Sequence, residues 1–313
     1  MKYEFIHEHQ KDDPLGELCQ ALEVTRSGYY QWSSRGISAR EEADEQIKTQ
    51  ILGIHKRARG RYGHRPVYEH LRDKGLECGR DKTLRLMQEM DISGSQASRY
   101  KPLGTDSRHD YGYSPNLLKE QGAPSRIDQV WVADTTYLRV EGGWMYLATV
   151  MDLFSRRILG WSLSEKNDSE LVCEALQNAR QTRGKLPAGI IHHSDRGSTY
   201  AGWAYRKLLG KLKMLSSMSA KANCYDNAAM ESFYGRFKTS TIGNRIFGHE
   251  WELRATVFEY IEVFYNRFRK HSSLGYQNPI EFEKKIAPMG AWQLKPSLLK
   301  TEPLLNQPTD TTN

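Results

Sequence analysis

Three acidic residues occupy positions where a carboxylate is costly unless it has a chemical role. Asp134 lies in the middle of a strand-like run, Asp195 follows directly on an apolar run, and Glu231 lies inside a helical pattern. A carboxylate removed from water is destabilising unless it is paired or bound to a metal ion. Carboxylates on separate elements can hold two Mg²⁺ ions about 3.5–4 Å apart for an in-line phosphoryl transfer. The residues alone leave other roles open: Asp134 could pair with a buried arginine, Asp195 could cap a turn, and Glu231 could be an exposed helix acid.

The spacing of these acids and the words around them are more specific than their types. Sixty residues lie between Asp134 and Asp195, and 35 lie between Asp195 and Glu231, which looks like the DDE triad of the retroviral-integrase superfamily. The neighbouring words match too: WVADTTY at 131–137, DLFSRR at 152–157, HSDRGS at 193–198, NCYDNA at 223–228, ESFY at 231–234, YNR at 265–267 and HSSLGY at 271–276. Together these words resemble the transposases of bacterial insertion sequences of family three, specifically their second-reading-frame product. The resemblance covers roughly residues 15–285.

The resemblance implies an RNase H-like fold and a DNA transposase that works by two-metal phosphoryl transfer. Asp134, Asp195 and Glu231 become the catalytic residues and the ligands of two Mg²⁺ ions, which Mn²⁺ could replace. A strand is cut at the end of the element, and the freed 3′-hydroxyl attacks a second phosphodiester without a covalent protein–DNA intermediate. Lys238, seven residues after Glu231, lies on the same helix face. Its implied role is to hold DNA near the scissile phosphate, and an ordinary surface lysine is the alternative.

The resemblance also implies the partners of the chain. They are double-stranded DNA, as terminal repeats and as target, and other copies of the chain assembled on that DNA. The start of the chain lacks a leucine-zipper heptad run, and in this family the upstream reading frame usually supplies the zipper and the principal end-binding helix-turn-helix. The active enzyme is therefore expected to contain the upstream-frame product as a fusion or partner. The expected location is the cytoplasm, at the nucleoid.

The elements before the acids are predicted to be helical. Helix, turn and helix are expected at 14–32, with Thr25 as an N-cap, followed by an amphipathic helix at 39–57. Two further helices, at 66–73 and 81–90, flank a glycine-containing stop, which is the pattern of a helix-turn-helix unit. The candidate recognition helix carries DNA contacts at Arg80, Lys82 and Arg85. A small helical bundle with a solvated basic face is the alternative.

The elements that must position the acids follow from residue 130 onward. Strands are expected at 130–140, 144–151 and 157–163 as an antiparallel meander, then at 188–193 and 213–218 between helices. Helices are expected at 168–183, 200–209, 226–239 and 249–269, with Asp226 or Asn227 as the cap of the Glu231 helix. This order predicts an α/β fold with a mixed five-stranded sheet flanked by helices, preceded by an all-α region. The expected domains are 1–98 for DNA binding, a basic linker at 99–128, the catalytic core at 129–285 and a disordered tail at 286–313.

Four other residues could serve the site. Arg267 and His271 belong to a basic cluster suited to phosphates, with a solvated charged face as the alternative. Asp152 is expected to be a turn or sheet-edge partner of Arg156 or Arg157 rather than a catalytic acid. His193 could contact DNA or a ligating carboxylate, or it could be a structural histidine.

Composition sets broader limits on function. The formal net charge is +7 with 45 Lys+Arg against 38 Asp+Glu, a mild surplus that allows a polyanionic partner. No apolar run is long enough for a membrane helix, so no membrane partner is expected. The four cysteines lie far apart without a CxxC pair, which argues against zinc and disulfides. The rival functions are a non-catalytic DNA-binding regulator derived from a transposase and a structure-specific nuclease of the same fold. No nucleophile among clustered arginines points to a tyrosine or serine recombinase.

Overall fold

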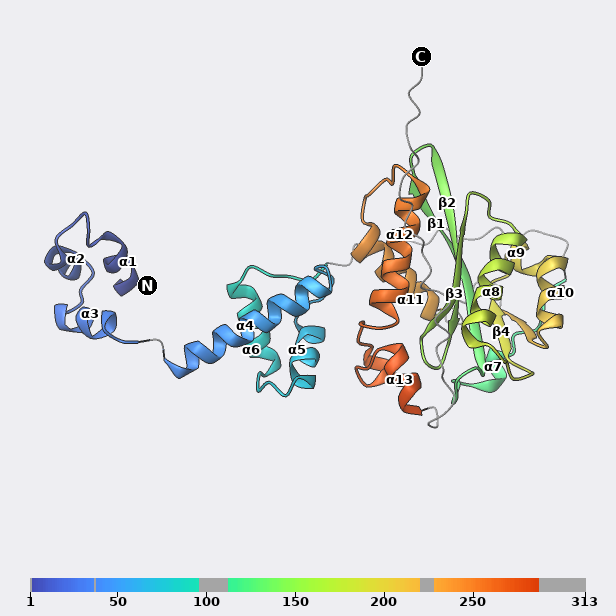
Figure 1. Cartoon of the computed structure of the whole chain (residues 1–313), viewed down its shortest axis with the longest axis horizontal. Coiled ribbons are helices and arrows are strands. Elements are labelled where there is room, and N and C mark those ends of the chain that lie inside the picture. The colour runs from blue at the N-terminus through green and yellow to red at the C-terminus, as the bar shows by residue number, and fades with distance from the viewer. Residues whose placement is uncertain (1, 37, 96–111, 220–227, 287–313) are drawn as a thin grey trace, which may run out of the picture. The chain divides into compact units, whose positions relative to one another are not determined.

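A computed structural model describes residues 2–36, 38–95, 112–219 and 228–286. Figure 1 shows the helices and strands that these residues form. The chain divides into two compact units, residues 1–96 and 97–313. Within the described ranges, no helix is both long and apolar enough to cross a membrane. The expected caps at Asp226 and Asn227, the linker residues 99–111 and the tail residues 287–313 lie outside the described residues.

The first unit is helical throughout, as expected. Its first three helices are α1 (Lys2–His9), α2 (Leu15–Ala21) and α3 (Arg26–Ser33). They bury Ile6, Cys19 and Tyr29 in a small cluster, and the Thr25 side chain caps α3 by accepting from Gly28 N at 3.1 Å. The sequence patterns predicted this cap but did not predict α1, whose short polar run shows no clear apolar period.

Three further helices of this unit pack on one another: α4 (Ala39–Arg57), α5 (His64–Asp73) and α6 (Arg80–Glu89). Ile47, Ile51 and Ile54 form the buried stripe of α4, at the spacing that places them on one face. Ser38 and Glu41 close a capping box at the start of α4, which stops the helix from fraying at the N-terminus.

The second unit is built on a five-stranded sheet of order β3-β2-β1-β4-β5. The strands are β1 (Val130–Val140), β2 (Gly143–Asp152), β3 (Ile158–Ser164), β4 (Ile191–Ser194) and β5 (Leu215–Met218). The first three are antiparallel, whereas β4 is parallel to β1 and β5 is parallel to β4. The mixed sheet predicted from the sequence is therefore confirmed, with the pairing order of an RNase H-like fold.

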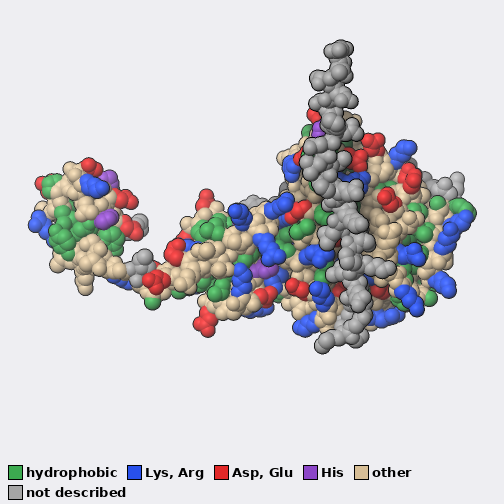
Figure 2. Space-filling model, in the orientation of Figure 1, with side chains coloured by type: hydrophobic (Ala, Val, Ile, Leu, Met, Phe, Trp, Pro, Cys, Tyr) green, Lys and Arg blue, Asp and Glu red, His purple; other side chains and the backbone are tan. Residues whose placement is uncertain are grey.

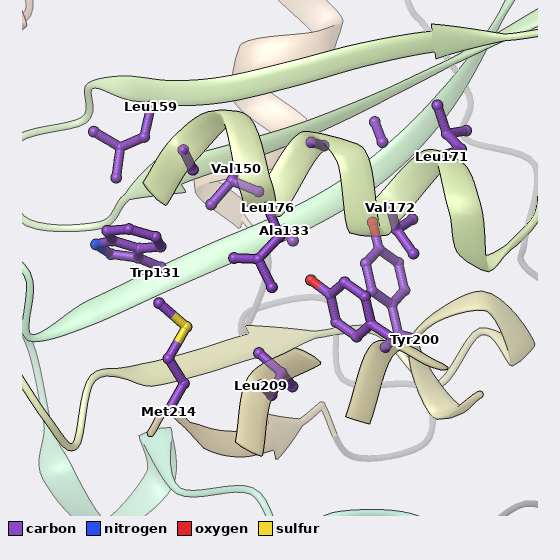
Figure 3. Packing of buried hydrophobic residues seen from close by; sticks show 14 of the residues in the cluster. Trp131, Ala133, Val150, Leu159, Leu171, Val172, Leu176, Tyr200, Leu209 and Met214 are labelled. Carbon is purple, nitrogen blue, oxygen red and sulfur yellow. The ribbon is translucent and has the colours of Figure 1, made fainter. Parts of the chain in front are cut away.

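Helices cover both faces of the sheet (Figure 1). One face carries α8 (Ser169–Arg183), α9 (Ser198–Ala201) and α10 (Trp203–Lys211), and the other carries α11 (Ala228–Phe237) and α12 (Glu250–Phe258). The main core lies under α8 and α10, where Trp131 and Ala133 of β1 meet Leu176 and Leu209 (Figure 3). A Cβ at Gly160 would lie 2.4 Å from the carbonyl oxygen of Ala175, so only glycine lets α8 approach β3 this closely.

Several element boundaries differ from the sequence expectation. The predicted helix at 249–269 is α12 followed by a π-helical stretch, Glu259–Tyr265, and a second π-helical stretch, Lys238–Ile242, follows α11. The predicted helix at 200–209 is divided at Gly202 into α9 and α10. Besides α1, the sequence did not predict the helices α7 (Leu118–Gln121) and α13 (Pro279–Ile286). Part of the expected linker also joins the sheet, since Leu117 N donates to Ser217 Oγ at 2.9 Å.

Candidate active site

The pairing of β1 with β4 brings Asp134 and Asp195 next to each other. Val130 pairs with Ile191 and Val132 with His193, a constant offset of 61 residues. Asp134 and Asp195 differ by the same 61 positions, just beyond the last hydrogen-bonded pair. Neighbouring strands lie about 4.8 Å apart, and residues in register point to the same face. The two carboxylates therefore arise side by side where β4 ends.

The helix that carries Glu231 lies against the same face of the sheet. Tyr234, three residues after Glu231, reaches β1 and β2 from α11. Its hydroxyl donates to the carbonyl oxygen of Asp134 at 2.8 Å, and Thr149 Oγ1 lies 2.8 Å from the same hydroxyl. Residues three apart on a helix share a side, so Glu231 is directed toward the strands that Tyr234 contacts. The Glu231 side chain itself is exposed.

Tyr200 reports the electrostatic field of the two aspartates. Burial raises the pKa of this tyrosine well above its ordinary value, and the negative charges of Asp134 and Asp195 raise it further. The hydroxyl lies 3.0 Å from Thr135 Oγ1, next to Asp134 in the chain. Both carboxylates are thus close to one buried neutral hydroxyl, which places a negative centre at this end of β1.

Lys238 faces the same centre from the end of α11. Its Nζ lies 4.4 Å from the centroid of the Tyr137 ring, a cation–π contact. Burial lowers the pKa of Lys238, and the charges of Tyr137 and Asp134 oppose this change. The half-buried ammonium group therefore lies on the Tyr137 ring within the electrostatic field of Asp134.

The donor set suits a magnesium ion, although the third acid is not gathered with the pair. Mg²⁺ prefers oxygen ligands, and it needs only one or two carboxylates because it keeps several of its waters. Asp134 offers such a carboxylate from the middle of β1, and Asp195 offers one from the end of the neighbouring β4. In the part of the chain that the structure describes, no three His, Cys, Asp or Glu side chains converge closely enough to hold a metal ion. Glu231 thus does not complete a group of three here.

The three candidate DNA contacts on α6 differ in their availability. Asp44 of α4 pairs with Lys82 at 2.6 Å and with Arg85 at 2.8 Å, and these hydrogen bonds lower the pKa of Asp44 to about 2. Arg85 is also paired with Glu89. Arg80 is the most exposed of the three cations, with 60% of its side chain accessible. Figure 2 shows Lys and Arg side chains together with Asp and Glu side chains on the surface around α4 and its neighbours, so the exposed cations of this part of the chain lie among acids.

Arg267 and His271 lie in different surroundings. Arg267 is exposed, as a phosphate contact requires. His271 is only 9% exposed, and burial lowers its pKa to about 2, so its imidazole is neutral. His271 can therefore offer a hydrogen bond to a DNA phosphate but no positive charge.

The structure decides the roles of two further residues. Asp152 is buried and accepts from Ser155 N and Asp128 N, both at 2.7 Å, so it stabilises a turn as expected. Its backbone N–H donates to the carbonyl oxygen of Arg157 at 2.9 Å, so it is a turn partner of Arg157 as predicted. Its carboxylate also has a charge partner that the sequence did not predict, Arg183 of α8, 3.7 Å away. His193 is buried, with Nδ1 2.9 Å from Ser217 Oγ, which fits the structural alternative.

Sequence reasoning missed the tyrosines that position the acids. Tyr200 and Tyr234 each contact the β1 backbone or the residue next to Asp134, and Tyr137 lies under Lys238. The spacing of Tyr234 from Glu231 was a usable signal, because a hydroxyl one turn away on the same helix side reaches the same strands. Tyr200 carried no such signal, because its proximity depends on the loop between β4 and α9.

Comparisons with known proteins cover most of the chain. Two families match the second unit, and both are described as an integrase core domain. The first matches residues 124–224 and the second matches residues 212–279. An HTH-like domain family matches residues 41–100. The chain is 40% identical over 274 residues to the insertion element IS600 uncharacterized 31 kDa protein of Shigella sonnei, covering 88% of this chain and 100% of that protein. It is 37% identical over 287 residues to the transposase InsF for insertion sequence IS3A of Escherichia coli, covering 91% of this chain and 99% of the relative.

Solved structures show more distant likeness. A simian T-cell lymphotropic virus intasome in complex with the PP2A regulatory subunit B56 gamma matches with a TM-score of 0.44 at 13% identity, over 84% of this chain and 80% of that one. The HTLV-2 integrase catalytic core domain in complex with magnesium matches with a TM-score of 0.39 at 13% identity, over 50% of this chain and 96% of that one. These scores are too low to carry an argument about the site.

Proposed function

The chain belongs to the transposases of insertion sequence family IS3, and from this premise we propose that it cuts DNA at the ends of its element and joins the freed 3′ ends to new DNA. The proposed catalytic residues are Asp134, Asp195 and Glu231. The observation that carries the assignment is the shared offset of 61 residues, which places two of the acids side by side at the carboxyl end of β4. Tyr234 supports it by directing the Glu231 helix toward the same strands.

Each side chain has a defined task in this proposal. Asp134 and Asp195 would hold one Mg²⁺ ion and Glu231 would share in holding a second, with Mn²⁺ as a substitute. Bound Mg²⁺ would supply an activated attacking oxygen and a stabilised leaving oxygen at the phosphorus atom. Lys238 would hold a DNA phosphate beside Asp134. Tyr200 and Tyr234 would keep the middle of β1 in place, because their hydroxyl groups contact Thr135 Oγ1 and the Asp134 carbonyl oxygen.

The DNA partners would be the terminal repeats and the target duplex. Arg80 and the exposed cations of the first unit would contact backbone phosphates, and Lys82 and Arg85 would do so only by giving up their pairing with Asp44. Arg267 would add a phosphate contact in the second unit. The active species would be an oligomer on DNA that includes the upstream-frame product as a fusion or partner.

The direct test measures products. The chain, alone and fused to the upstream-frame product, is incubated with Mg²⁺ and labelled DNA that ends at the terminus of the element. We expect nicked strands with free 3′-hydroxyls, followed by joined products, from the fusion at least. DNA binding without any metal-dependent product in either form would favour the rival function, a non-catalytic regulator derived from a transposase.

Lys238 provides a second prediction for this site. Replacing Lys238 with glutamine removes the ammonium group beside Asp134 while keeping a side chain that can lie on Tyr137. We expect strand joining to fall by about tenfold to a hundredfold, because a charge-assisted contact to phosphate contributes about 1.5–3 kcal/mol. Lys238→Arg, which keeps the charge, should recover part of the rate. Equal rates for the wild type and Lys238→Gln would remove Lys238 from the site.

A further inference from the structure

A pocket is lined in part by residues of α11. It has a volume of about 290 Å³, and its lining includes three arginines from three separate segments: Arg156 from the turn after β2, Arg236 from α11 and Arg269 from the segment after the π-helical stretch 259–265. His271 and Tyr265 also line it. All of these residues belong to the second unit.

The charges of this pocket are not balanced from within. Among the described lining residues there is no carboxylate. The guanidinium of Arg269 lowers the pKa of Arg236, since two cations held close together repel each other. Three arginines that line one pocket without an acid give it a positive potential, which favours the binding of an anion.

Two buried nitrogens of the pocket residues also lack a partner. Arg269 Nε and His271 Nε2 are buried, and neither makes a hydrogen bond within the described structure. The His271 side chain is nine-tenths buried. Because buried polar atoms are almost always hydrogen-bonded, unpaired nitrogens of this kind point to a ligand that the pocket receives. An oxyanion could accept from Arg269 Nε, and from His271 Nε2 in the tautomer that carries the proton there.

The pocket is held in shape by the buried network next to it. Arg156 follows Ser155, whose hydroxyl donates to Glu283 at 2.6 Å and whose N–H donates to Asp152 at 2.7 Å. Arg156 itself has a φ of 61°, in the left-handed region that is unfavourable for a non-glycine residue. The turn thus presents the Arg156 guanidinium from a fixed backbone, at some conformational cost.

The position of the pocket relative to the acids identifies its ligand. Ser232, on the pocket lining, is adjacent to Glu231 in the chain, and Arg236 follows Glu231 by five residues. Five residues span about 7.5 Å along a helix, and Glu231 and Arg236 point to different sides of α11. The pocket and the proposed catalytic acid Glu231 are thus neighbours on one helix, and a phosphate of the same DNA strand is the anion that this neighbourhood favours.

We propose that this pocket binds one phosphodiester group of the DNA strand next to the scissile position. Arg156, Arg236 and Arg269 supply the charge, and His271 supplies a neutral hydrogen bond. The proposal rests on the transposase function proposed above. It makes these arginines positioning residues for the DNA strand, and gives none of them a part in the chemical step.

The test measures DNA binding without chemistry. The full chain binds a labelled duplex that ends at the element terminus, in EDTA, over a series of salt concentrations. The variants Arg236→Gln, Arg269→Gln and Arg156→Gly each remove one pocket cation, and glycine suits the positive φ at position 156. The matched control is Arg206→Gln, an exposed arginine of α10, which covers the opposite face of the sheet.

Each pocket variant should weaken binding by about tenfold. Each should also reduce the slope of log affinity against log salt, by at most about 0.9, because the pocket neutralises one phosphate and loss of that contact retains one counterion. Arg206→Gln should leave the slope unchanged, and thermal unfolding should verify that all variants are folded. Pocket variants with the slope of the wild type would overturn the proposal.

Two further measurements distinguish a DNA phosphate from a free phosphate as the ligand, and the pocket proposal from the proposed transposase function. If orthophosphate raises the unfolding temperature of the wild type but not of Arg236→Gln, while the DNA salt slopes are equal, the pocket is a free-anion site and the proposal is wrong. Because the binding assay needs no metal, its outcome is independent of catalysis. Loss of the salt slope together with a wild type that cuts no DNA would contradict the proposed function and leave the phosphate pocket supported.

Discussion

Replacing Asp134 with asparagine is expected to abolish metal-dependent cutting and joining of DNA while leaving binding in EDTA intact. Asparagine has nearly the same size, and the backbone carbonyl of residue 134 can still accept from Tyr234. The variant loses only the negative charge, which would hold a metal ion beside Asp195. We expect a loss of about a thousandfold or more in the rate of strand joining, since charge stabilisation by a bound metal contributes several kcal/mol to such a transition state.

The control for this experiment is the same substitution at Asp168. The Asp168 carboxylate caps α8 by accepting from Glu170 N and Leu171 N, both at 3.1 Å. Asparagine caps helices about as well as aspartate, so Asp168→Asn should retain the activity of the wild type. An Asp134→Asn variant that keeps Mg²⁺-dependent joining near the rate of the wild type would show that the acidic pair is not the catalytic centre.

Replacing Arg183 with methionine is expected to have the largest effect on stability. Arg183 lies at the centre of a buried network: its Nη2 lies 2.5 Å from Glu283 Oε1, its Nε lies 2.8 Å from Asp128 Oδ1, and Asp152 lies 3.7 Å away. Burial raises the pKa of Asp152 to about 6 even with this cation present. Methionine would leave these carboxylates without their common partner, which costs about 3–5 kcal/mol when a buried pair is broken.

The measurement is the free energy of unfolding of the full chain in urea, with tryptophan fluorescence as the signal. Trp131 is fully buried and its Nε1 donates to Asp128 at 2.9 Å, so it reports on this region. The control is Arg254→Met, because Arg254 forms an exposed pair with Glu250 on α12. Exposed pairs of this kind contribute at most about 1 kcal/mol. Equal losses in the two variants would mean that the buried network does not hold α13 to the sheet.

The network also connects the two proposed sites to the stability of the fold. Glu283 of α13 receives hydrogen bonds from Arg157, Arg183 and Ser155, which border the turn that carries Arg156. A variant that breaks the network should therefore disturb the pocket of Arg156, Arg236 and Arg269 more than it disturbs the surroundings of Asp134. For Arg183→Met, this disturbance would appear as a smaller slope of log DNA affinity against log salt.

Much of the fold could be predicted because its signals are local. The strand-like run of β1 and the apolar run before Asp195 required only neighbouring residues, and Thr25 caps α3 through a contact three residues away. The helices α1 and α13 were missed because short polar helices depend on tertiary packing more than on their own pattern. The π-helical stretch after α12 was missed for a similar reason, since one extra residue in a turn does not change an apolar pattern visibly.

The sequence by itself determined the family and singled out the residues that we propose for the chemistry. The types and spacing of Asp134, Asp195 and Glu231 and the words around them pointed to the family, and the comparisons confirmed that family. Only the tertiary structure decided how these groups are surrounded. It placed Tyr200 and Tyr234 against β1, gave Asp152 a partner on α8 and gathered three arginines from distant segments around one hollow. The physical reason is that contacts between distant segments depend on the strand register and on helix packing, which a local pattern does not contain.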